Sequence, residues 1–135
     1  MIRSSFRNRF DGLPVKFARE MSSGVMIRKV ENGEILIGSE RYTGTLALTS
    51  ERVVNEWADA AFDELAEGDL DALLATEPEL ILLGTGGESR FAPRELTFAL
   101  ARRGVGLEAM TTPAAARTFN VLAGEGRRIA AVLYQ

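Results

Sequence analysis

Glycine amides beside hydroxyl groups are the first feature of this chain that could do chemistry. The run Gly84-Thr-Gly-Gly87 directly follows an apolar segment, and closely spaced glycine N–H groups can approach a phosphate or carboxylate. The run is not an intact nucleotide motif, because a dinucleotide fingerprint needs glycine where Ser89 stands and a Walker loop needs a Gly-Lys-Ser/Thr that is absent. The pattern favours a structural turn and leaves a small anion site as the alternative.

A predicted helix start could contribute to the same site. Thr111 and Thr112 precede Pro113, an order typical of a helix N-terminus, and Thr112 is the predicted N-cap. Loops that follow adjacent parallel strands meet at one edge of a sheet, so residues 84–90 and this helix start are expected to lie together. The alternative is structural, with the threonine capping the helix and the other polar side chains solvated or fixing a loop. The candidate ligand-binding residues are Gly84, Thr85, Gly86, Gly87, Arg90, Thr111, Thr112 and Asn120.

Charged residues near the C-terminus form a third group. Glu125 precedes Arg127 and Arg128 across a glycine turn, so a carboxylate and two guanidiniums could tie the preceding helix to neighbouring backbone. Alternatively, the arginines contact a partner protein, since arginine is enriched at interfaces. The partner-contact candidates are Arg117, Arg127 and Arg128.

The absence of histidine and cysteine from the sequence excludes several kinds of chemistry. Disulfides, thiolate catalysis, Cys/His zinc sites and Ser-His-Asp triads all need groups that this chain lacks. The acidic residues between positions 64 and 71 lie in one local stretch and are expected on a solvated face. No catalytic residue, metal site or cofactor is therefore predicted, and the question of an enzymatic role is left open with the balance against it.

Length and composition predict one globular domain. The chain has 135 residues, of which 46% are hydrophobic and 26% charged, and no apolar run approaches the roughly 20 residues of a membrane span. Charge is unevenly distributed: residues 31–81 hold thirteen Asp/Glu against two Lys/Arg, whereas residues 1–30 hold seven Lys/Arg against two Asp/Glu. This layout could steer protein partners but gives no continuous basic stripe for nucleic acid. The expected location is the cytoplasm.

Residues 1–24 have the character of an appended N-terminal arm. Arg3, Arg7 and Arg9 interleave with aromatic residues, and glycine and proline interrupt the run, so no core periodicity survives. Three interpretations compete: a disordered or loosely docked tail, which is favoured, an Arg-rich peptide that touches a membrane surface or partner, and a start codon assigned too early. Met21 motivates the last. Residues 25–135 form the predicted domain.

The first half of this domain has the texture of short β-strands. Asn32-Gly33 is typical of a tight hairpin turn because both residues tolerate positive φ. Gly44 within the third run indicates a bulge or a close backbone approach. Ser50 could cap a helix over residues 50–60, with Trp57 in the core, and a helix is favoured there over an irregular path. The predicted strands are residues 25–30, 34–37 and 41–48.

The second half alternates strands with helices. Residues 80–83 are continuously apolar, which is typical of a strand buried on both faces by helices. Pro93 and Gly104 bound one predicted helix, and another begins at Thr112 and ends at Gly124 or Gly126. A short helix is predicted at 69–76, longer helices at 93–102 and after 112, and strands at 80–83, 105–110 and 129–134. This pattern predicts an α/β layered domain with a C-terminal β-α-β-α-β unit and right-handed crossovers.

Several motifs in fixed order resemble a known family. Gly106 to Thr112, Arg117-Thr-Phe-Asn120 and Glu125-Gly-Arg-Arg128 resemble the C-terminal signature of a small α/β domain family of largely unknown function. That family includes a mitochondrial respiratory complex I assembly factor and an adipogenesis-associated domain protein. The resemblance extends to residues 84–87 and, more weakly, 42–46, so it covers roughly residues 25–135. One departure is Thr111, which stands where relatives often have the aspartate that could act as an acid or base.

The resemblance implies a fold in which an N-terminal β meander packs beside the α/β unit. It also implies a non-enzymatic protein-binding or assembly role, linked through one relative to a membrane respiratory complex approached from its cytoplasmic side. Protein partners and peripheral contact with such a complex follow from that role, whereas self-association is left open. The alternative function is a small anionic-ligand-binding protein or enzyme that uses the 84–90 loop and the helix start at residue 112.

Overall fold

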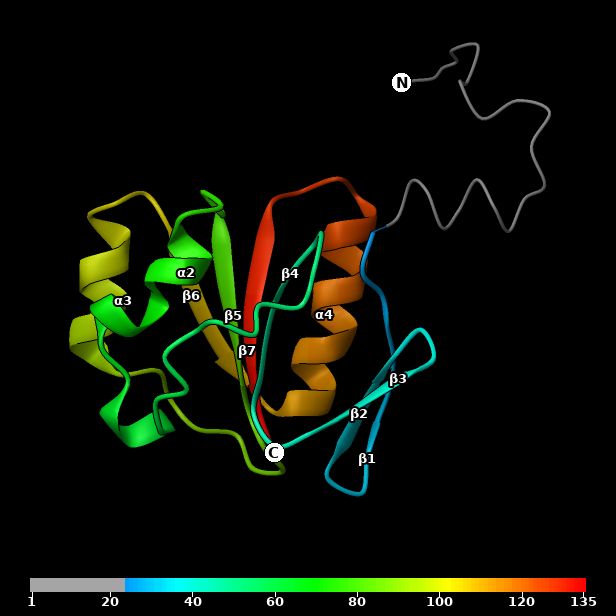
Figure 1. Ribbon diagram of the computed structural model, residues 1–135. Helices are drawn as coiled ribbons and strands as arrows, with labels where there is room; N and C mark the ends of the chain where they lie inside the picture. The colour runs from blue at the N-terminus through cyan, green and yellow to red at the C-terminus, as the bar shows by residue number, and fades with distance from the viewer. Residues whose placement is uncertain (1–23) are drawn as a thin grey trace, which may run out of the picture.

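A four-stranded sheet forms the centre of the domain, which the computed structural model describes over residues 24–135 (Figure 1). The strand order is β4-β7-β5-β6. Strands β5 (Leu80–Thr85), β6 (Gly106–Met110) and β7 (Ile129–Tyr134) are parallel, and β4 (Leu46–Thr49) pairs antiparallel with β7. The predicted α/β fold with its β-α-β-α-β unit is confirmed. The predicted arm lies outside the described residues, apart from Gly24.

A smaller antiparallel meander precedes the main sheet. It consists of β1 (Ile27–Glu31), β2 (Glu34–Ile37) and β3 (Glu40–Thr43), in that order. The predicted turn between β1 and β2 is confirmed, since Asn32 and Gly33 have φ of 54° and 75°. Two positive φ values in succession give the primed turn whose twist matches antiparallel strands.

The prediction of one strand over residues 41–48 is wrong. The chain breaks at Gly44, where φ is 76°, so β3 ends in the meander and β4 begins in the main sheet. A Cβ at this glycine would meet no atom within 4 Å, so no close backbone approach requires glycine here. Gly44 also lies between two strands rather than within a ladder, so it does not form a bulge. The left-handed backbone is the reason for glycine here, because it redirects the chain from one sheet to the other.

The predicted helix over residues 50–60 is also wrong. The Thr49 hydroxyl accepts hydrogen bonds from the N–H groups of Glu51 and Arg52 at 3.2 and 3.3 Å, which turns the chain back on itself. The Val54 N–H then donates to the Ala47 carbonyl at 2.8 Å. The local side-chain bonds of Thr49 therefore outcompete a helix start at the neighbouring serine. Trp57 is half-buried against the core, as predicted, but on this extended path.

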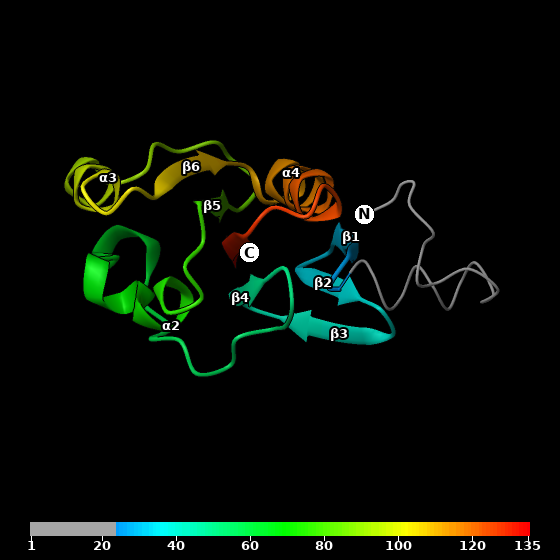
Figure 2. The ribbon, with the colours of Figure 1, turned by 90° about the horizontal axis from the view of Figure 1, so that it is seen from above.

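Helices cover the two faces of the main sheet. One face packs against α3 (Arg94–Ala101), α2 (Asp71–Leu74) and the short 3-10 turns η1 (Phe62–Glu64) and η2 (Glu67–Leu70). The other face packs against α4 (Thr112–Gly124) and the meander (Figure 2). Side chains of β5 alternate between these two cores, so Ile81 and Leu83 enter one and Leu82 enters the other. The continuous apolar run is therefore a strand buried on both faces, as the sequence predicts.

Candidate functional site

The structure brings the two predicted loops together. Strands β5 and β6 are adjacent and parallel, with Gly84 opposite Met110, so the chain following each strand lies at the same edge of the sheet. Gly86 and Thr112 are bonded to each other twice: the Gly86 N–H donates to the Thr112 hydroxyl at 2.8 Å, and the Thr112 N–H donates to the Gly86 carbonyl at 2.9 Å. The glycine-rich turn and the start of α4 thus form one structural unit.

Thr112 occupies the centre of this unit, and its hydroxyl also donates to the Tyr134 carbonyl at the end of β7. Only 2% of Thr112 is exposed. We call the group formed by Gly84, Gly86, Thr112 and Tyr134 the Thr112 junction. It connects the ends of β5 and β7 to the first turn of α4, with the hydroxyl both donating and accepting.

The N-cap of α4 is Thr111, so the prediction that Thr112 is the cap is wrong by one residue. The Thr111 side chain accepts from the Ala114 N–H at 3.4 Å, and the Thr111 carbonyl accepts from the Ala115 N–H at 2.8 Å. Thr112 begins the helix itself, because its side chain is committed to strand ends rather than to helix amides.

Each N–H group in the first turn of α4 therefore has a partner within the fold. Thr112 donates to the loop, Pro113 has no N–H, and Ala114 and Ala115 donate to Thr111. A helix N-terminus binds an anion through free amides. Here an anion would have to displace bonds that hold the strand ends together. It could reach the Gly86 amide only by displacing the Thr112 hydroxyl.

The glycines of the loop have structural roles in this arrangement. A Cβ at Gly84 would lie 2.8 Å from the Thr112 hydroxyl oxygen and 2.9 Å from Leu133 Cδ2, so only glycine allows α4 to approach β5 and β7 this closely. Gly86 has φ of 86°, which favours glycine, whereas Gly87 faces open space. The Thr85 hydroxyl lies 2.6 Å from the Glu88 carbonyl and 3.1 Å from that of Met110.

Arg90 belongs to a different set of contacts. Its guanidinium pairs with Asp63, and its Cζ lies 4.4 Å from the centre of the Phe62 ring. Phe62 packs edge-on against Tyr134, whose hydroxyl donates to the Ala60 carbonyl at 2.7 Å. Burial, with smaller contributions from nearby carboxylates, raises the pKa of Tyr134 from its ordinary 10 to about 12. Arg90 therefore fixes the η1 segment over the end of β7.

Asn120 lies on α4 against the meander, away from the Thr112 junction. Its side-chain oxygen accepts from the Ile27 N–H at 2.9 Å, and its nitrogen donates to the Ile27 carbonyl at 2.7 Å. Both backbone groups of one β1 residue are thereby satisfied by one amide. Arg117, on the same helix, lines a shallow groove with Arg28 and Lys29 of β1.

The C-terminal arginines contact the segment that leads into β5. Arg127 pairs with Glu79 at 2.9 Å, and the Arg128 Nε donates to the Glu77 carbonyl at 2.8 Å. These contacts tie the turn after α4 to neighbouring backbone, which is the structural interpretation of this motif. Glu125 forms no ion pair with these arginines in the described structure; its N–H instead bonds to carbonyls of the last turn of α4.

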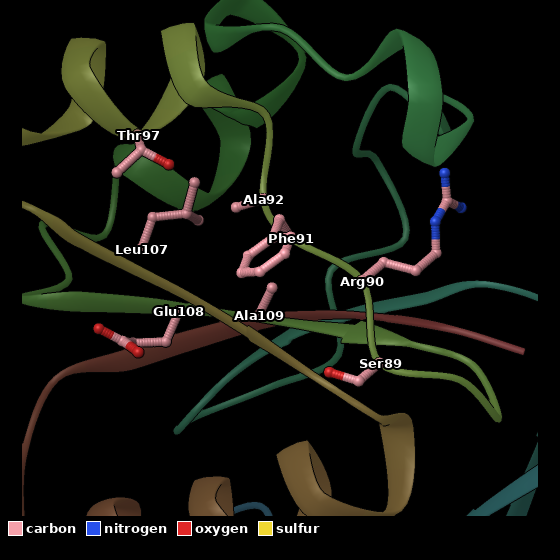
Figure 3. Close-up of a pocket in the computed structure, with 8 residues that line it drawn as sticks. All are labelled: Ser89, Arg90, Phe91, Ala92, Thr97, Leu107, Glu108 and Ala109. Carbon is pink, nitrogen blue, oxygen red and sulfur yellow. The ribbon is translucent and has the colours of Figure 1, made fainter.

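A hollow of about 400 Å³ that sequence reasoning missed lies beside β6 (Figure 3). Its walls are the loop that precedes α3, the first half of α3 and the middle of β6. Phe91 lies in that loop and is 96% exposed. An aromatic residue between a glycine-rich turn and a proline-started helix was the only available signal, and periodicity does not reveal exposure within a loop. The lining residues are Ser89, Arg90, Phe91, Ala92, Thr97, Leu107, Glu108 and Ala109.

No group of three or more carboxylate, histidine or cysteine side chains within residues 24–135 could hold a metal ion. Within the same range, no helix combines the length and apolar character needed to cross a bilayer.

Comparison with known proteins identifies the family. A family described as "Protein of unknown function (DUF498/DUF598)" matches residues 27–134, which include every helix and strand described above. This chain belongs to the DUF498/DUF598 family. The predicted resemblance to a small domain family that includes a complex I assembly factor is thereby confirmed.

Curated relatives of this DUF498/DUF598 chain differ in length and in name. A "13 kDa major membrane protein" of Francisella tularensis is 28% identical over 116 residues, covering 84% of this chain and 94% of the relative. The human "NADH dehydrogenase (ubiquinone) 1 alpha subcomplex assembly factor 3" is 29% identical over 117 residues, covering 85% of this chain. The chain spans only 63% of that human protein.

Solved structures share the DUF498/DUF598 fold. A protein of Xanthomonas campestris is 36% identical with a TM-score of 0.73, and the match covers 82% of this chain and 83% of the other. A protein of Bordetella parapertussis is 31% identical with a TM-score of 0.74, covering 83% and 96%. The likeness to these two chains therefore extends over about four-fifths of this chain.

Proposed function

We propose that this chain is a non-enzymatic protein-binding domain that acts in the assembly or upkeep of a membrane respiratory complex from its cytoplasmic side. The observation that carries the proposal is the similarity to the human assembly factor, which extends over 117 residues and 85% of this chain. A match of that extent reaches well beyond a single motif. Assembly factors act through protein contacts, and a peripheral contact with the membrane complex is part of the proposal.

The use of the polar groups within the fold also supports a binding role over catalysis. The hydroxyl of Thr112 and the amide of Gly86 are bonded to each other, and Arg90 is paired with Asp63. An anionic ligand at this loop, the alternative function, would need these groups to exchange their present partners. Because opening the Gly86–Thr112 bonds would leave buried backbone groups unpaired, the alternative has a cost that protein binding elsewhere on the surface avoids.

A gene deletion combined with complementation tests the proposed function. Native gels of membranes should show loss of an assembled respiratory complex in the deletion strain, with recovery on expression of the wild-type chain. Chemical crosslinking of a tagged chain in gently solubilised cells should recover subunits of that complex or their assembly proteins. An unchanged gel pattern together with crosslinks to unrelated proteins would refute the proposed role.

Native mass spectrometry of the purified chain tests the ligand alternative separately. The proposed function predicts the mass of the bare polypeptide. One stoichiometric anionic metabolite, released by conditions that disrupt the Thr112 junction, would favour the alternative instead. Arg90→Gln is the informative variant, since its side chain is partly exposed and the substitution removes the guanidinium that would bind an anion.

A further inference from the structure

Strand β6 is an edge of the main sheet with outward backbone groups. The Gly106 N–H donates to the Glu79 carbonyl at 3.0 Å, and β6 continues in a parallel ladder with β5. Backbone groups of alternate residues in such a ladder point to opposite sides, so the N–H and C=O groups of Leu107 and Ala109 point away from β5. Within residues 24–135 these groups make no hydrogen bond. An edge of this kind is a template for another strand.

The hollow beside this edge has four apolar residues among its eight lining residues, and Phe91 provides its exposed apolar surface. Leu107 and Ala109 project from the same face of β6, and Phe91 lies next to them in the loop (Figure 3). Phe91 is 96% exposed, so its ring contributes almost nothing to the core of its own domain. A strand added to β6 would place alternate side chains beside this ring and bury it. The backbone and the apolar surface therefore favour the same kind of occupant, an extended segment.

Glu108 determines which extended segment fits. It lies between Leu107 and Ala109, projects from the opposite face of β6, and is exposed without an ion pair inside the described range. Directly opposed residues of paired strands interact, and opposite charges there are favourable. A segment with lysine or arginine opposite Glu108 therefore fits best.

The same residue disfavours a second copy of this chain. Antiparallel pairing of two β6 strands that uses the outward groups of both Leu107 and Ala109 places Glu108 opposite Glu108 of the second copy. Like charges at directly opposed positions are destabilising. A charged residue in the middle of an edge strand is also a usual protection against self-pairing. The edge is therefore suited to a different chain.

We propose that the β6 edge and the hollow beside Phe91 bind an extended segment of a partner protein by strand addition, with a Lys or Arg opposite Glu108 between two apolar residues. This inference rests on the proposed function in that the occupant is a protein. Main-chain hydrogen bonds supply affinity in this mode of recognition, and the alternate side chains supply specificity.

Selection from a random peptide library displayed on phage tests the proposal with the full chain as bait. Enriched peptides should share an apolar-(Lys/Arg)-apolar pattern and should perturb the amide NMR signals of Leu107 and Ala109. The best enriched peptide, N-methylated at the amides facing β6, should lose measurable binding. The Glu108→Lys variant should instead enrich Asp or Glu at the central position, while Glu95→Lys on α3 keeps the original preference.

Two phenylalanines provide a matched pair for the affinity measurement. Phe91→Ser should weaken binding of the best enriched peptide by about tenfold or more, because a central aromatic contact is lost. Phe98→Ser on α3 should leave the affinity unchanged, since Phe98 is 56% exposed but does not line the hollow. Thermal unfolding of both variants should match the wild type, so a binding difference cannot come from misfolding.

Other outcomes would overturn the proposal. These are no enrichment, enriched peptides without a central cation, NMR shifts confined to another surface such as the groove between β1 and α4, or a wild-type dimer that pairs through β6. Failure of the proposed function is separable. If crosslinks to a respiratory complex persist in the Phe91→Ser and Glu108→Lys variants, the proposed binding site at β6 is refuted and the proposed function is retained. If peptides bind at β6 but no such crosslinks form, the proposed function is refuted and the binding site at β6 is retained.

Discussion

The Thr112 junction and the β6 edge belong to the same sheet but differ in how their polar groups are used. At the junction, the hydroxyl of Thr112 and both backbone groups of Gly86 are paired inside the fold. At the edge, backbone groups of Leu107 and Ala109 point outward next to an exposed Phe91. The Thr112 junction, where the sequence motifs gather, therefore stabilises the domain, whereas the β6 edge has free backbone groups that suit the binding of another chain.

The largest expected effect comes from opening the junction with Thr112→Val. This substitution keeps the shape of the side chain but leaves the Gly86 N–H and the Tyr134 carbonyl without their present partner. Unpaired buried groups cost about 1–3 kcal/mol each, so the free energy of unfolding should fall by about 3 kcal/mol. Urea denaturation measures it, and Thr112→Ser, which keeps the hydroxyl, should lose much less. Equal losses for both variants would contradict the role of the hydroxyl.

A smaller loss is expected from crowding the junction with Gly84→Ala. The added methyl group would overlap the Thr112 hydroxyl and Leu133, and overpacking of this kind costs about 2 kcal/mol. The matched control is Gly87→Ala in the same loop, where a Cβ meets open space and should change stability by less than about 0.5 kcal/mol. Similar melting temperatures for the two variants would show that the close approach of α4 is not tight.

Removing the charge from the edge with Glu108→Val should alter association rather than stability. Without like charges at the centre of β6, pairing of two copies becomes more favourable, while the free energy of unfolding should change by less than about 0.5 kcal/mol. Sedimentation velocity at matched concentrations should show more self-associated chain than the wild type. Glu95→Val on α3 is the control for hydrophobicity alone. Indistinguishable sedimentation of Glu108→Val and wild type would contradict the protective role of Glu108.

The smallest expected effect lies outside both regions, in the Arg52–Glu56 ion pair. A hydrogen bond from Arg52, then one from the backbone of Glu56 itself, and last the charge of Arg52 lower the pKa of the Glu56 carboxyl from its ordinary 4.5 to about 2. A lowered pKa means that the pair stabilises the fold above about pH 4.5 and that this contribution is lost as pH falls toward 2. An NMR titration should show the low midpoint, and Arg52→Gln should return it toward the ordinary value. A midpoint that Arg52→Gln leaves in place would assign the shift to another cause.

Local signals in the sequence predicted those parts of the fold that local chemistry determines. Asn32-Gly33 forms its turn, and the apolar run 80–83 forms a doubly buried strand, because turn dihedrals and hydrophobicity act within a few residues. Gly44 was misinterpreted because its conformation serves a change of sheet, and the partner of β4 lies more than 80 residues away in β7. The failed helix at 50–60 has a local cause, the bonds of Thr49, that a propensity argument does not weigh.

The candidate site shows the same limit more strongly. Topology correctly brought the 84–87 loop to the start of α4, but the sequence does not reveal that Thr112 and Gly86 satisfy each other. Likewise, Arg90 forms an ion pair with Asp63, which lies in the 3-10 turn η1. No pattern in the sequence predicted where that turn lies. Phe91 is exposed because no other element of the fold packs against its ring, and that arrangement depends on the whole fold rather than on neighbouring residues.

The pairing of β4 with β7 also dictates when the domain can form during synthesis. Strand β4 ends at residue 49, and its partner strand β7 begins at residue 129. Ile27 of the meander likewise forms its hydrogen bond with Asn120, which is synthesised late. Strand β4 lacks its ladder partner, and the meander lacks the helix against which it packs, until the ribosome has released those late residues. The nascent first half therefore exposes strand edges for most of translation, and unpaired edges of this kind make an incomplete chain prone to aggregation.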